Sequence, residues 1–482
     1  MTGNSSFPTF RDMILIEDDP ALFAVTCERT GIPYWALIRN VVFRAMMSDF
    51  FYDAPIPPAG ASRRVSAKAI VTLAKGTAHN IRSRASVPDG ICIMASGMGL
   101  QIRNGRWFNR LCDHFALAAP AETLVIEEGF RWNWPFPRVF EQVAFHAPYQ
   151  VAGELSGRVL ARSSHRKKAA EIIAIAARRA KEQIGWSPPQ SRIAQIEKTL
   201  ARRAAAAPFM YSMYRQMLRA TGAKLLLKEE GCYSRSAVTV AAARSLGIHV
   251  AEYQHGMISS GHDSYNFAPA AIANEALRRC LPDTLLCYGD WWAEQVNAPV
   301  EKISIGNPHR EDVLTHISQP ARKETFLVIG NGIETQRYMG LAVKLAEGLG
   351  GTGVKVVFRP HPFERASVAE TAHLYPTVEI DTRADIYQSL ADARFVISEV
   401  STALFEAVGL ADCIFVWDTP KSRSGLPNHP FIDVADAEDI IRRVCGNDVS
   451  GNKCDEDAIW AKNWRENYRS FLTRQGVAVH GR

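Results

Sequence analysis

A short apolar run ends in a polar loop at Val356-Val357-Phe358-Arg359-Pro360-His361-Pro362. A second run of this kind is Phe395-Val396-Ile397-Ser398-Glu399-Val400-Ser401-Thr402-Ala403, and the residues from 404 to 407 are typical of a helix. In a parallel α/β sheet, ligands bind beyond the carboxyl ends of the strands. A helix start with free backbone N–H groups is a natural site for anions. The two strand ends therefore predict a phosphate site that contains Arg359, His361, Ser401 and Thr402.

Strand-length apolar runs recur along the rest of the chain, and helix-like segments separate several of them. The first series comprises residues 91–94, 124–126, 224–227, 248–251 and 284–288. The second series comprises residues 325–329, 354–358, 378–380, 395–397 and 414–417, with helix-like segments at 336–348 and 386–391. This alternation is typical of parallel sheets. The sequence therefore predicts an α/β fold with two Rossmann-like domains.

The length of 482 residues exceeds what one hydrophobic core usually supports, which also favours two domains. We expect a first domain at 1–318, with an Ala- and Arg-rich helical insertion at about 163–220, and a second domain at 319–445. The best linker candidate is 319–323, Gln-Pro-Ala-Arg-Lys. Residues 446–482 should form a helical segment that packs back on the first domain, because their aromatic residues recur at mostly helical spacing.

Composition places the chain among ordinary globular proteins, with 47% hydrophobic and 22% charged residues. No run is long and apolar enough for a transmembrane helix, and the first residues do not resemble a secretory signal. The nine cysteines show no paired framework, and Cys92, Cys287 and Cys413 lie in apolar runs typical of buried thiols. Together these features predict a cytoplasmic protein.

Positive charge is concentrated between residues 158 and 203, although the net charge is only +6. One interpretation is the solvated face of Ala-rich helices. The other is attraction to anionic lipid headgroups or an anionic glycan, which would place the protein peripherally at the inner face of the cytoplasmic membrane. Nucleic acid is not expected as a partner, because no recognised binding motif accompanies the charge.

Two adjacent carboxylates, Glu229 and Glu230, follow the apolar run at 225–227. At a strand end such a pair supplies a general base whose pKa is raised by its neighbour. The alternative is that both carboxylates pair with Lys228 and Arg235. Glu127 and Glu128 follow the run at 124–126 in the same way, so they are candidates for the same role.

Glycine-containing turns follow two other strand-like runs. In Gln254-His255-Gly256, the imidazole and the backbone N–H beside glycine are suited to donate to phosphate. Gly330-Asn331-Gly332 follows the first run of the second series, where glycine lets the backbone approach a diphosphate closely. His255, His262 and His361 have no partner at metal-ligand spacing, and no Gly-x-Ser-x-Gly elbow occurs, so neither a metal site nor a serine hydrolase is predicted.

Taken together, these motifs resemble GT-B glycosyltransferases of bacterial surface and capsular polysaccharide synthesis. The similar groups are the capsule-type Kdo transferases, the GT-B sialyltransferases and the CDP-glycerol glycerophosphotransferases. The resemblance implies that His361 and Pro362 form the donor's His-Pro motif, that Ser401 and Thr402 form its Ser/Thr pair, and that Glu406 holds the donor ribose. It also implies that residues 229–231 match the sialyltransferase acidic motif, which bears the acceptor's base, and that His255 matches a histidine of the glycerophosphotransferases.

The function expected from this resemblance is sugar transfer without a metal or other cofactor. The donor would be a nucleotide sugar, CMP- or CDP-linked, and the acceptor a surface polysaccharide or glycolipid of the cell envelope. Glu229, Glu230 or His255 would deprotonate the acceptor, and Gly330, Asn331, Gly332, Arg359 and the donor motifs would hold the nucleotide. Two alternatives stay open, namely a GT-B nucleotide-sugar epimerase and a non-catalytic assembly protein that binds glycan or lipid.

Overall fold

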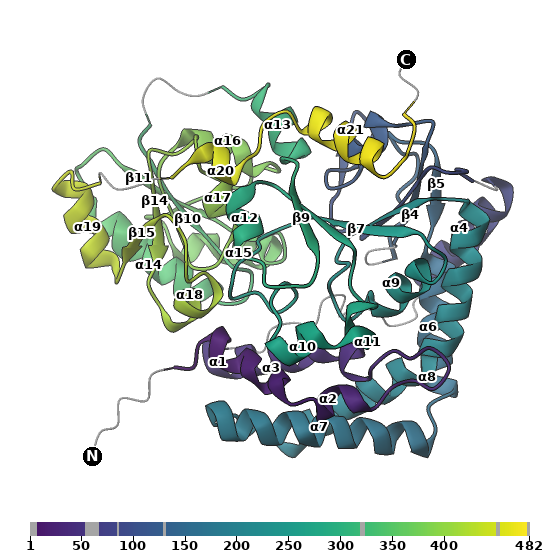
Figure 1. Ribbon diagram of the computed structural model, residues 1–482. Helices are drawn as coiled ribbons and strands as arrows, with labels where there is room; N and C mark the ends of the chain where they lie inside the picture. The colour runs from purple at the N-terminus through teal and green to yellow at the C-terminus, as the bar shows by residue number, and fades with distance from the viewer. Residues whose placement is uncertain are drawn as a thin grey trace.

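The computed structural model describes residues 7–53, 67–83, 86–128, 132–318, 323–449 and 454–479. Within these ranges the chain forms one sheet of seven strands, a second sheet of six strands and a small hairpin. Figure 1 shows the two large sheets side by side, each covered by helices. Most of the linker predicted at 319–323 lies outside the described residues.

The first large sheet is parallel throughout and has the order β5-β4-β1-β6-β7-β8-β9. Its strands are β1 Ile91–Ala95, β4 Thr123–Glu127, β5 Val143–Phe145, β6 Leu225–Lys228, β7 His249–Tyr253, β8 Thr284–Cys287 and β9 Glu301–Ser304. The hairpin β2 Leu100–Arg103 and β3 Arg106–Asn109 follows β1. The associated helices are α5 Asp113–Ala118, α6 Ala147–Val159, α9 Ala237–Arg244, α10 Pro269–Ala273, α11 Glu275–Arg278, α12 Asp290–Glu294 and α13 Pro308–Leu314. The order in which the strands are added to the sheet reverses between β1 and β6. A ligand site is expected at the carboxyl ends of these two strands.

The second sheet is also parallel and has the order β12-β11-β10-β13-β14-β15. Its strands are β10 Thr325–Ile329, β11 Lys355–Arg359, β12 Glu379–Ile380, β13 Ala393–Ser398, β14 Cys413–Trp417 and β15 Ile432–Val434. Its helices are α14 Thr335–Gly348, α15 Arg365–Thr371, η4 Ala372–Leu374, α16 Ile386–Asp392, α17 Thr402–Glu406, α18 Pro420–Gly425 and α19 Ala437–Cys445. This is the order 3-2-1-4-5-6 of dinucleotide-binding folds, and its point of reversal lies between β10 and β13.

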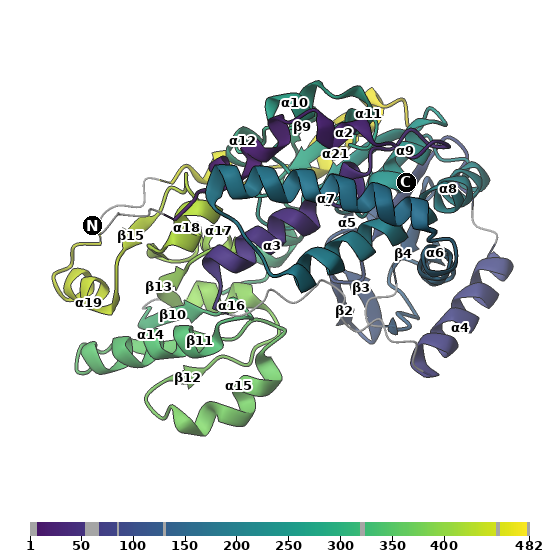
Figure 2. The same ribbon diagram turned by 90° about the horizontal axis from the view of Figure 1, so that it is seen from below.

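A helical layer covers one side of the first sheet. It consists of α1 Phe10–Ile14, η1 Leu15–Asp18, α2 Ala21–Ala24, η2 Trp35–Leu37, α3 Arg39–Phe51, α7 Ser163–Ile184 and α8 Gln190–Thr221. Figure 2 shows α7 lying across this layer, with α4 (Ala67–Ser83) at the rim of the molecule. Burial of Ile172, Ala176 and Ala180 along one stripe of α7 explains why an Ala-rich helix packs here. Helices α7 and α8 occupy the Ala- and Arg-rich region at 163–220, where the sequence predicts helices.

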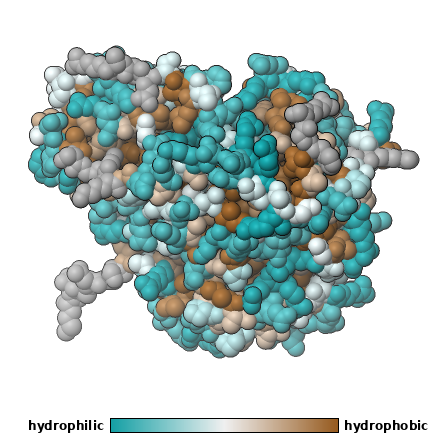
Figure 3. Space-filling view, turned by 45° about the horizontal axis from the view of Figure 1, so that its top comes forward, coloured by the Kyte–Doolittle hydropathy of each residue, from teal (hydrophilic) through white to brown (hydrophobic). Residues whose placement is uncertain are grey.

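The C-terminal segment contacts both halves of the molecule. Helix α20 (Glu456–Ile459) is followed by Trp460, whose indole N–H donates to the carbonyl of Phe405 at 3.2 Å. Helix α21 (Trp464–Arg474) buries Tyr468 and Phe471 in the same apolar cluster as Phe115 of the first half. In the space-filling view, a notch at the upper edge separates the two lobes (Figure 3).

The two parallel sheets confirm the predicted α/β class with two Rossmann-like domains. We call the part built on the first sheet the first domain and the part built on the second sheet the second domain. The strand predictions lie within about two residues of the observed ends, whereas β5, β9, β15 and the β2–β3 hairpin were not predicted. Cys92, Cys287 and Cys413 are buried free thiols, as expected. Among the described helices, none is long and apolar enough to span a membrane.

Candidate functional site

Glu229 lies at the reversal point of the first sheet, where its carboxylate ties three strand ends together. The backbone N–H of Ser96 donates to Oε2 at 2.8 Å, and the Ser96 hydroxyl donates to Oε1. The hydroxyl of Tyr253 donates to Oε2 at 3.1 Å. Ser96 follows β1, Glu229 follows β6 and Tyr253 ends β7. This fully buried carboxylate therefore links the ends of the three strands. Its partners give Glu229 a structural role.

The other carboxylate candidates of the first domain are engaged in ion pairs. Glu230 has a positive φ of 58° and pairs with Arg235, which was the alternative interpretation of its sequence. Glu127 pairs with Arg138, and both side chains are buried. Burial raises the pKa of Glu127 to about 8, against the opposing effect of Arg138. Glu128 lies 3.7 Å from both Lys228 Nζ and an Arg235 nitrogen.

His255 follows β7 and is backed by a buried carboxylate that the sequence did not reveal. Its Nδ1 lies 3.8 Å from Glu252 Oε1, and within the described chain it makes no hydrogen bond. Glu252 is held in place, because the Tyr265 hydroxyl and the Cys232 N–H donate to its two oxygens at 2.8 and 2.7 Å. Burial raises the pKa of Glu252, while His255 lowers it. At this distance the carboxylate of Glu252 lies behind the ring without a hydrogen bond to it.

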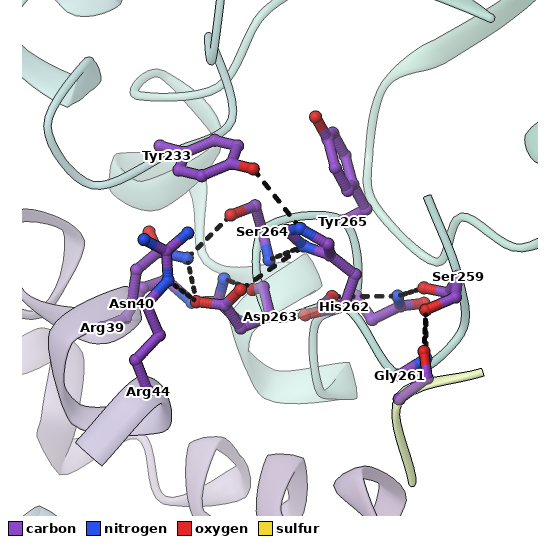
Figure 4. Close-up of polar contacts among 12 residues, drawn as sticks. Arg39, Asn40, Arg44, Tyr233, Ser259, Gly261, His262, Asp263, Ser264 and Tyr265 are labelled. Carbon is purple, nitrogen blue, oxygen red and sulfur yellow. Dashed lines mark hydrogen bonds and ion pairs between the residues drawn. The ribbon is translucent and has the colours of Figure 1, made fainter. Parts of the chain in front are cut away.

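His262, which lies near His255 in sequence, belongs to a packed polar cluster (Figure 4). The Ser264 N–H donates to its Nδ1 at 3.1 Å, so in the neutral ring the proton sits on Nε2, 3.3 Å from the Tyr233 hydroxyl. Its neighbour Asp263 accepts a hydrogen bond from Asn40 of α3 at 2.7 Å. The cluster thereby joins α3 to the loop that follows β7, and burial lowers the pKa of His262 to about 4.

The buried His262 should make folding sensitive to acid. The unfolded chain takes up a proton near pH 6.5, whereas the folded protein does so only near pH 4. Stability is therefore complete above pH 6.5 and is lost as pH falls through this window. In His262→Gln, the free energy of unfolding measured with urea should depend less steeply on pH between these values, by about 1.4 kcal/mol per unit. Equal slopes in the two proteins would contradict the neutral, buried state of His262.

In the second domain, the loops after β10 and β11 meet at Gly332 and His361. Gly332 has φ of +78°, and a Cβ atom there would come within 2.8 Å of His361 Nδ1. The Phe363 N–H donates to that same Nδ1 at 3.2 Å, so in the neutral ring the proton sits on Nε2 and can be donated to a ligand. Burial lowers the pKa of His361, which favours the neutral form. The structure thus brings together two residues that the sequence predicted to bind the donor.

Gly330 and Asn331 shape the first of these loops. A Cβ atom on Gly330 would lie 2.3 Å from Glu364 Oε1, which accepts the His361 N–H at 2.7 Å. Asn331 Oδ1 accepts the N–H groups of Ile333 and Glu334 at 3.0 and 2.9 Å. Glycine is therefore required for the close approach, and the asparagine side chain stabilises the turn. Pro362 is exposed beside this loop.

The Ser/Thr pair lies where the two domains meet. Ser401 is the N-cap of α17, and its hydroxyl accepts the Ala403 N–H at 3.2 Å. A Cβ atom built on Gly256 would lie 3.9 Å from Thr402 Oγ1, so the Gln-His-Gly turn of the first domain faces this pair. Glu406 accepts a hydrogen bond from the Tyr387 hydroxyl at 3.3 Å. Burial raises its pKa.

The guanidinium of Arg359 is bonded to Asp381 and Ser389, not to the other residues predicted to bind the donor. Its Nη1 donates to Asp381 at 2.7 Å and to the Ser389 hydroxyl at 2.8 Å, and the side chain is buried. Burial opposes ionisation of Asp381, yet the hydrogen bonds from Ser389, Arg383 and Arg359 lower its pKa to about 2. These contacts tie β11 to its neighbours, so they give Arg359 a structural role beside the predicted one.

The reversal point of the second sheet holds an ion network that sequence reasoning missed. Glu334 follows β10, Glu399 follows β13, and the buried ammonium of Lys421 pairs with both carboxylates. Glu399 also accepts hydrogen bonds from Tyr338 and Thr419 at 2.7 and 2.8 Å. Glu399 stands directly after β13, which was the available signal, whereas Glu334 stands immediately before α14. No sequence pattern links either acid to a lysine on α18.

An open pocket of about 480 Å³ lies between the domains, where residues of β2 and of α13 and its C-terminal end face residues at and near α16. It is lined by Arg103, Asp312, Val313, His316, Ile317, Asp385 and Gln388, none of which was predicted to bind a ligand. Asp312 accepts a hydrogen bond from Arg103 at 2.9 Å across it. In the described ranges, no three His, Cys, Asp or Glu side chains gather in a way that would hold a metal ion.

No protein-family model and no curated protein sequence matches this chain. Solved structures with a similar arrangement include a UDP-GlcNAc 2-epimerase from Methanocaldococcus jannaschii, at 11% identity and TM-score 0.44, covering 80% of this chain and 99% of that one. The S. aureus MnaA–UDP structure has 9% identity and TM-score 0.45, covering 82% and 99%. The spinosyn rhamnosyltransferase SpnG has 12% identity and TM-score 0.40, covering 80% and 98%. These scores are too low to carry over an active site, so function has to be argued from the chain's own residues.

Proposed function

We propose that this protein is a GT-B glycosyltransferase that binds a nucleotide-activated sugar between its two domains. One observation supports the proposal above the others. The turn that bears His255 approaches the Ser401-Thr402 pair, with Gly256 and Thr402 facing each other across the domain boundary. A candidate base on one domain thus stands opposite a candidate phosphate site on the other, which is the arrangement that group transfer requires.

In this proposal His255 is the base that activates the acceptor. With its Nδ1 toward Glu252, its Nε2 takes the proton of an acceptor hydroxyl. The oxygen then forms a bond to the anomeric carbon as the bond between that carbon and the nucleotide phosphate breaks. The ring proton of His361 and the backbone N–H groups beside Gly332 stabilise the negative charge that the leaving nucleotide acquires. The proposed reaction uses no cofactor or metal ion.

The resemblance seen in the sequence guides the proposed substrates. We propose a CMP- or CDP-linked sugar as donor and a capsular polysaccharide or glycolipid of the cell envelope as acceptor. Glu406 lies four residues after Thr402, within reach of a ribose bound at the same loop. Burial raises the pKa of Glu406, and the Tyr387 hydroxyl donates a hydrogen bond to its carboxylate at 3.3 Å.

Epimerisation of a nucleotide sugar is the second candidate function. Gly256 lies opposite Thr402 of the proposed phosphate site, so the His255 turn would lie beside a donor bound there. The same base is therefore placed to remove a proton from the donor sugar itself. Conversion of a nucleotide sugar without any acceptor would identify the epimerase, whereas transfer that requires an acceptor would identify the transferase.

A nucleotide screen tests the donor site directly. Thermal unfolding should shift upward with one of CMP, CDP, UDP or GDP, because a ligand that binds only the folded state stabilises it. His361→Ala should lower the affinity for that nucleotide by roughly tenfold to a hundredfold, since it removes a hydrogen bond to a charged group. The matched control is His373→Ala, an exposed histidine of the same domain. Undiminished binding in His361→Ala, or no shift with any nucleotide, would contradict the assignment.

A further inference from the structure

Helix α4 presents polar and small residues to the protein and apolar residues to solvent. Its inner side binds the edge strand β5, because Asn80 exchanges hydrogen bonds with the backbone of Phe145 at 2.9 and 2.8 Å. His79 Nε2 lies 2.8 Å from the Val143 carbonyl, and the Thr72 hydroxyl donates to the Trp132 carbonyl at 2.8 Å. Gly76 lets the helix approach closely, with a Cβ position 3.4 Å from Phe145 Cβ. This is the reverse of an ordinary surface helix.

The outer side of α4 forms an exposed apolar stripe. Ile70, Val71 and Ile81 are 59%, 51% and 67% exposed. Together with Ala74 and Ala78 they recur at spacings of three, four and seven residues, which places them on one face of the helix. Isolated apolar side chains on a surface are common, but a continuous stripe opposite a polar inner face indicates a partner.

Helix α6, which packs beside α4, also carries exposed apolar side chains. Leu155 and Val159 are 53% and 79% exposed and lie one turn apart. The opposite side of α6 packs tightly on α8 through glycines, since a Cβ atom on Gly157 would lie 2.9 Å from the Arg202 carbonyl. Figure 2 shows α4, α6 and α8 grouped at one end of the molecule. We call the outer sides of α4 and α6 the α4–α6 face.

Basic residues border the α4–α6 face. Helix α4 carries Lys68, Lys75 and Arg82 and no acidic residue. Arg158 of α6 is about half exposed, although Glu154 lies 3.9 Å from it. A second copy of the chain would bring a border of the same sign against this one, and like charges repel. An apolar stripe with a basic border instead complements a membrane surface that contains anionic lipid.

The basic region predicted from the sequence at 158–203 contributes less, because several of its charges are paired within the protein. Lys168 lies 2.9 Å from Glu28, Arg179 lies 3.9 Å from Asp19, and Arg192 pairs with Asp49. These pairs bind α7 and α8 to the N-terminal helices. The remaining exposed basic residues near the start of α7, such as Arg162 and Arg166, lie next to the end of α6.

We propose that the α4–α6 face docks on an anionic lipid bilayer, with the apolar side chains entering the headgroup boundary and the basic border contacting lipid phosphates. The face packs on β5, which is at the end of the first sheet away from β9 and the second domain. Docking therefore leaves the notch between the domains accessible. The proposal does not depend on which nucleotide-sugar reaction the protein catalyses.

Vesicle flotation with the full-length protein tests this proposal. The protein should float with vesicles that contain phosphatidylglycerol and not with vesicles of pure phosphatidylcholine, and added salt should weaken binding. Leu155→Glu/Val159→Glu should lower vesicle affinity at least tenfold, because it puts charge into the apolar contact. Lys75→Gln should lower it roughly fivefold. All three side chains are exposed, so the fold is expected to persist, as circular dichroism would verify.

A matched control separates this surface from general hydrophobicity. Leu374 is an equally exposed leucine on the second domain, so Leu374→Glu should leave flotation unchanged. The proposal is overturned if the wild-type protein does not float with anionic vesicles, or if Leu155→Glu/Val159→Glu floats as well as wild type. Concentration-dependent dimers that the double variant abolishes, without vesicle binding, would also overturn it in favour of a second copy.

Discussion

Replacing His255 with alanine should lower turnover by about a hundredfold to ten-thousandfold, with nucleotide binding unchanged. The expectation rests on geometry within the first domain. Glu229 is held by Ser96 and Tyr253, and Glu230 by Arg235. By contrast, the Nδ1 of His255 makes no hydrogen bond within the described residues and has the fixed carboxylate of Glu252 behind it. The same turn also faces Thr402 across the domain boundary. The measurement is steady-state turnover, with nucleotide binding followed separately by thermal shift.

Three comparisons make the His255 experiment decisive. His165→Ala, at the half-exposed start of α7 in the same domain, should leave turnover unchanged. Added imidazole should restore part of the activity of His255→Ala, because it supplies the missing base. Glu230→Gln should mainly alter stability, since it removes a partner of Arg235. If Glu230→Gln abolishes turnover while His255→Ala retains it, the base is Glu230.

Lys421→Met should reduce the free energy of unfolding of the second domain by about 3–5 kcal/mol. The ammonium group is buried between the carboxylates of Glu334 and Glu399, so its removal leaves two buried negative charges close together. Arg337 compensates only in part, from 2.9 Å on the Glu399 side and 3.8 Å on the Glu334 side. Urea unfolding, followed by a probe in the second domain, measures the change.

The matched control for this experiment lies two residues away on the same helix. Arg423 pairs with Asp418 at 2.6 Å, but its side chain is 65% exposed. Arg423→Met should therefore change the free energy of unfolding by no more than about 0.5 kcal/mol. Adding Glu334→Gln to Lys421→Met should recover part of the loss, because it removes one uncompensated charge. Equal destabilisation by Lys421→Met and Arg423→Met would show that the network does not stabilise the domain.

Most of the sheet architecture followed from apolar runs of strand length. Residues 91–94 and 325–329 have no competing pattern, and each became a central strand. The strands that escaped prediction are peripheral. In strand β9, Glu301–Ser304, three of the four residues are charged or polar, because its side chains are exposed or only partly buried at the sheet edge. An edge strand lacks the continuous apolar run that marks a strand buried on both faces.

Parts of the candidate site could be predicted where polar residues or glycines lie in the loop that follows a strand. Gly332 and His361 were expected together and lie in contact, because adjacent parallel strands end at the same sheet edge. The role of Glu252 was not predicted because this residue lies inside β7. Its carboxylate is explained only by the hydrogen bonds from Tyr265 and the Cys232 N–H, which the fold brings to it. The ion pairs of Lys421 were not predicted either, because its two carboxylate partners are distant in sequence. Such buried pairings depend on tertiary contacts that no local pattern records.

The side chain of Arg310, on α13, has a mechanical consequence for the two domains. It donates to Glu456 of α20 at 3.0 Å and to the Val408 carbonyl of the second domain at 2.7 Å. One side chain of α13 thus binds both α20 and the second domain. Sliding the two domains past each other would break both hydrogen bonds at once. Arg310 thus holds the two domains in register at this point.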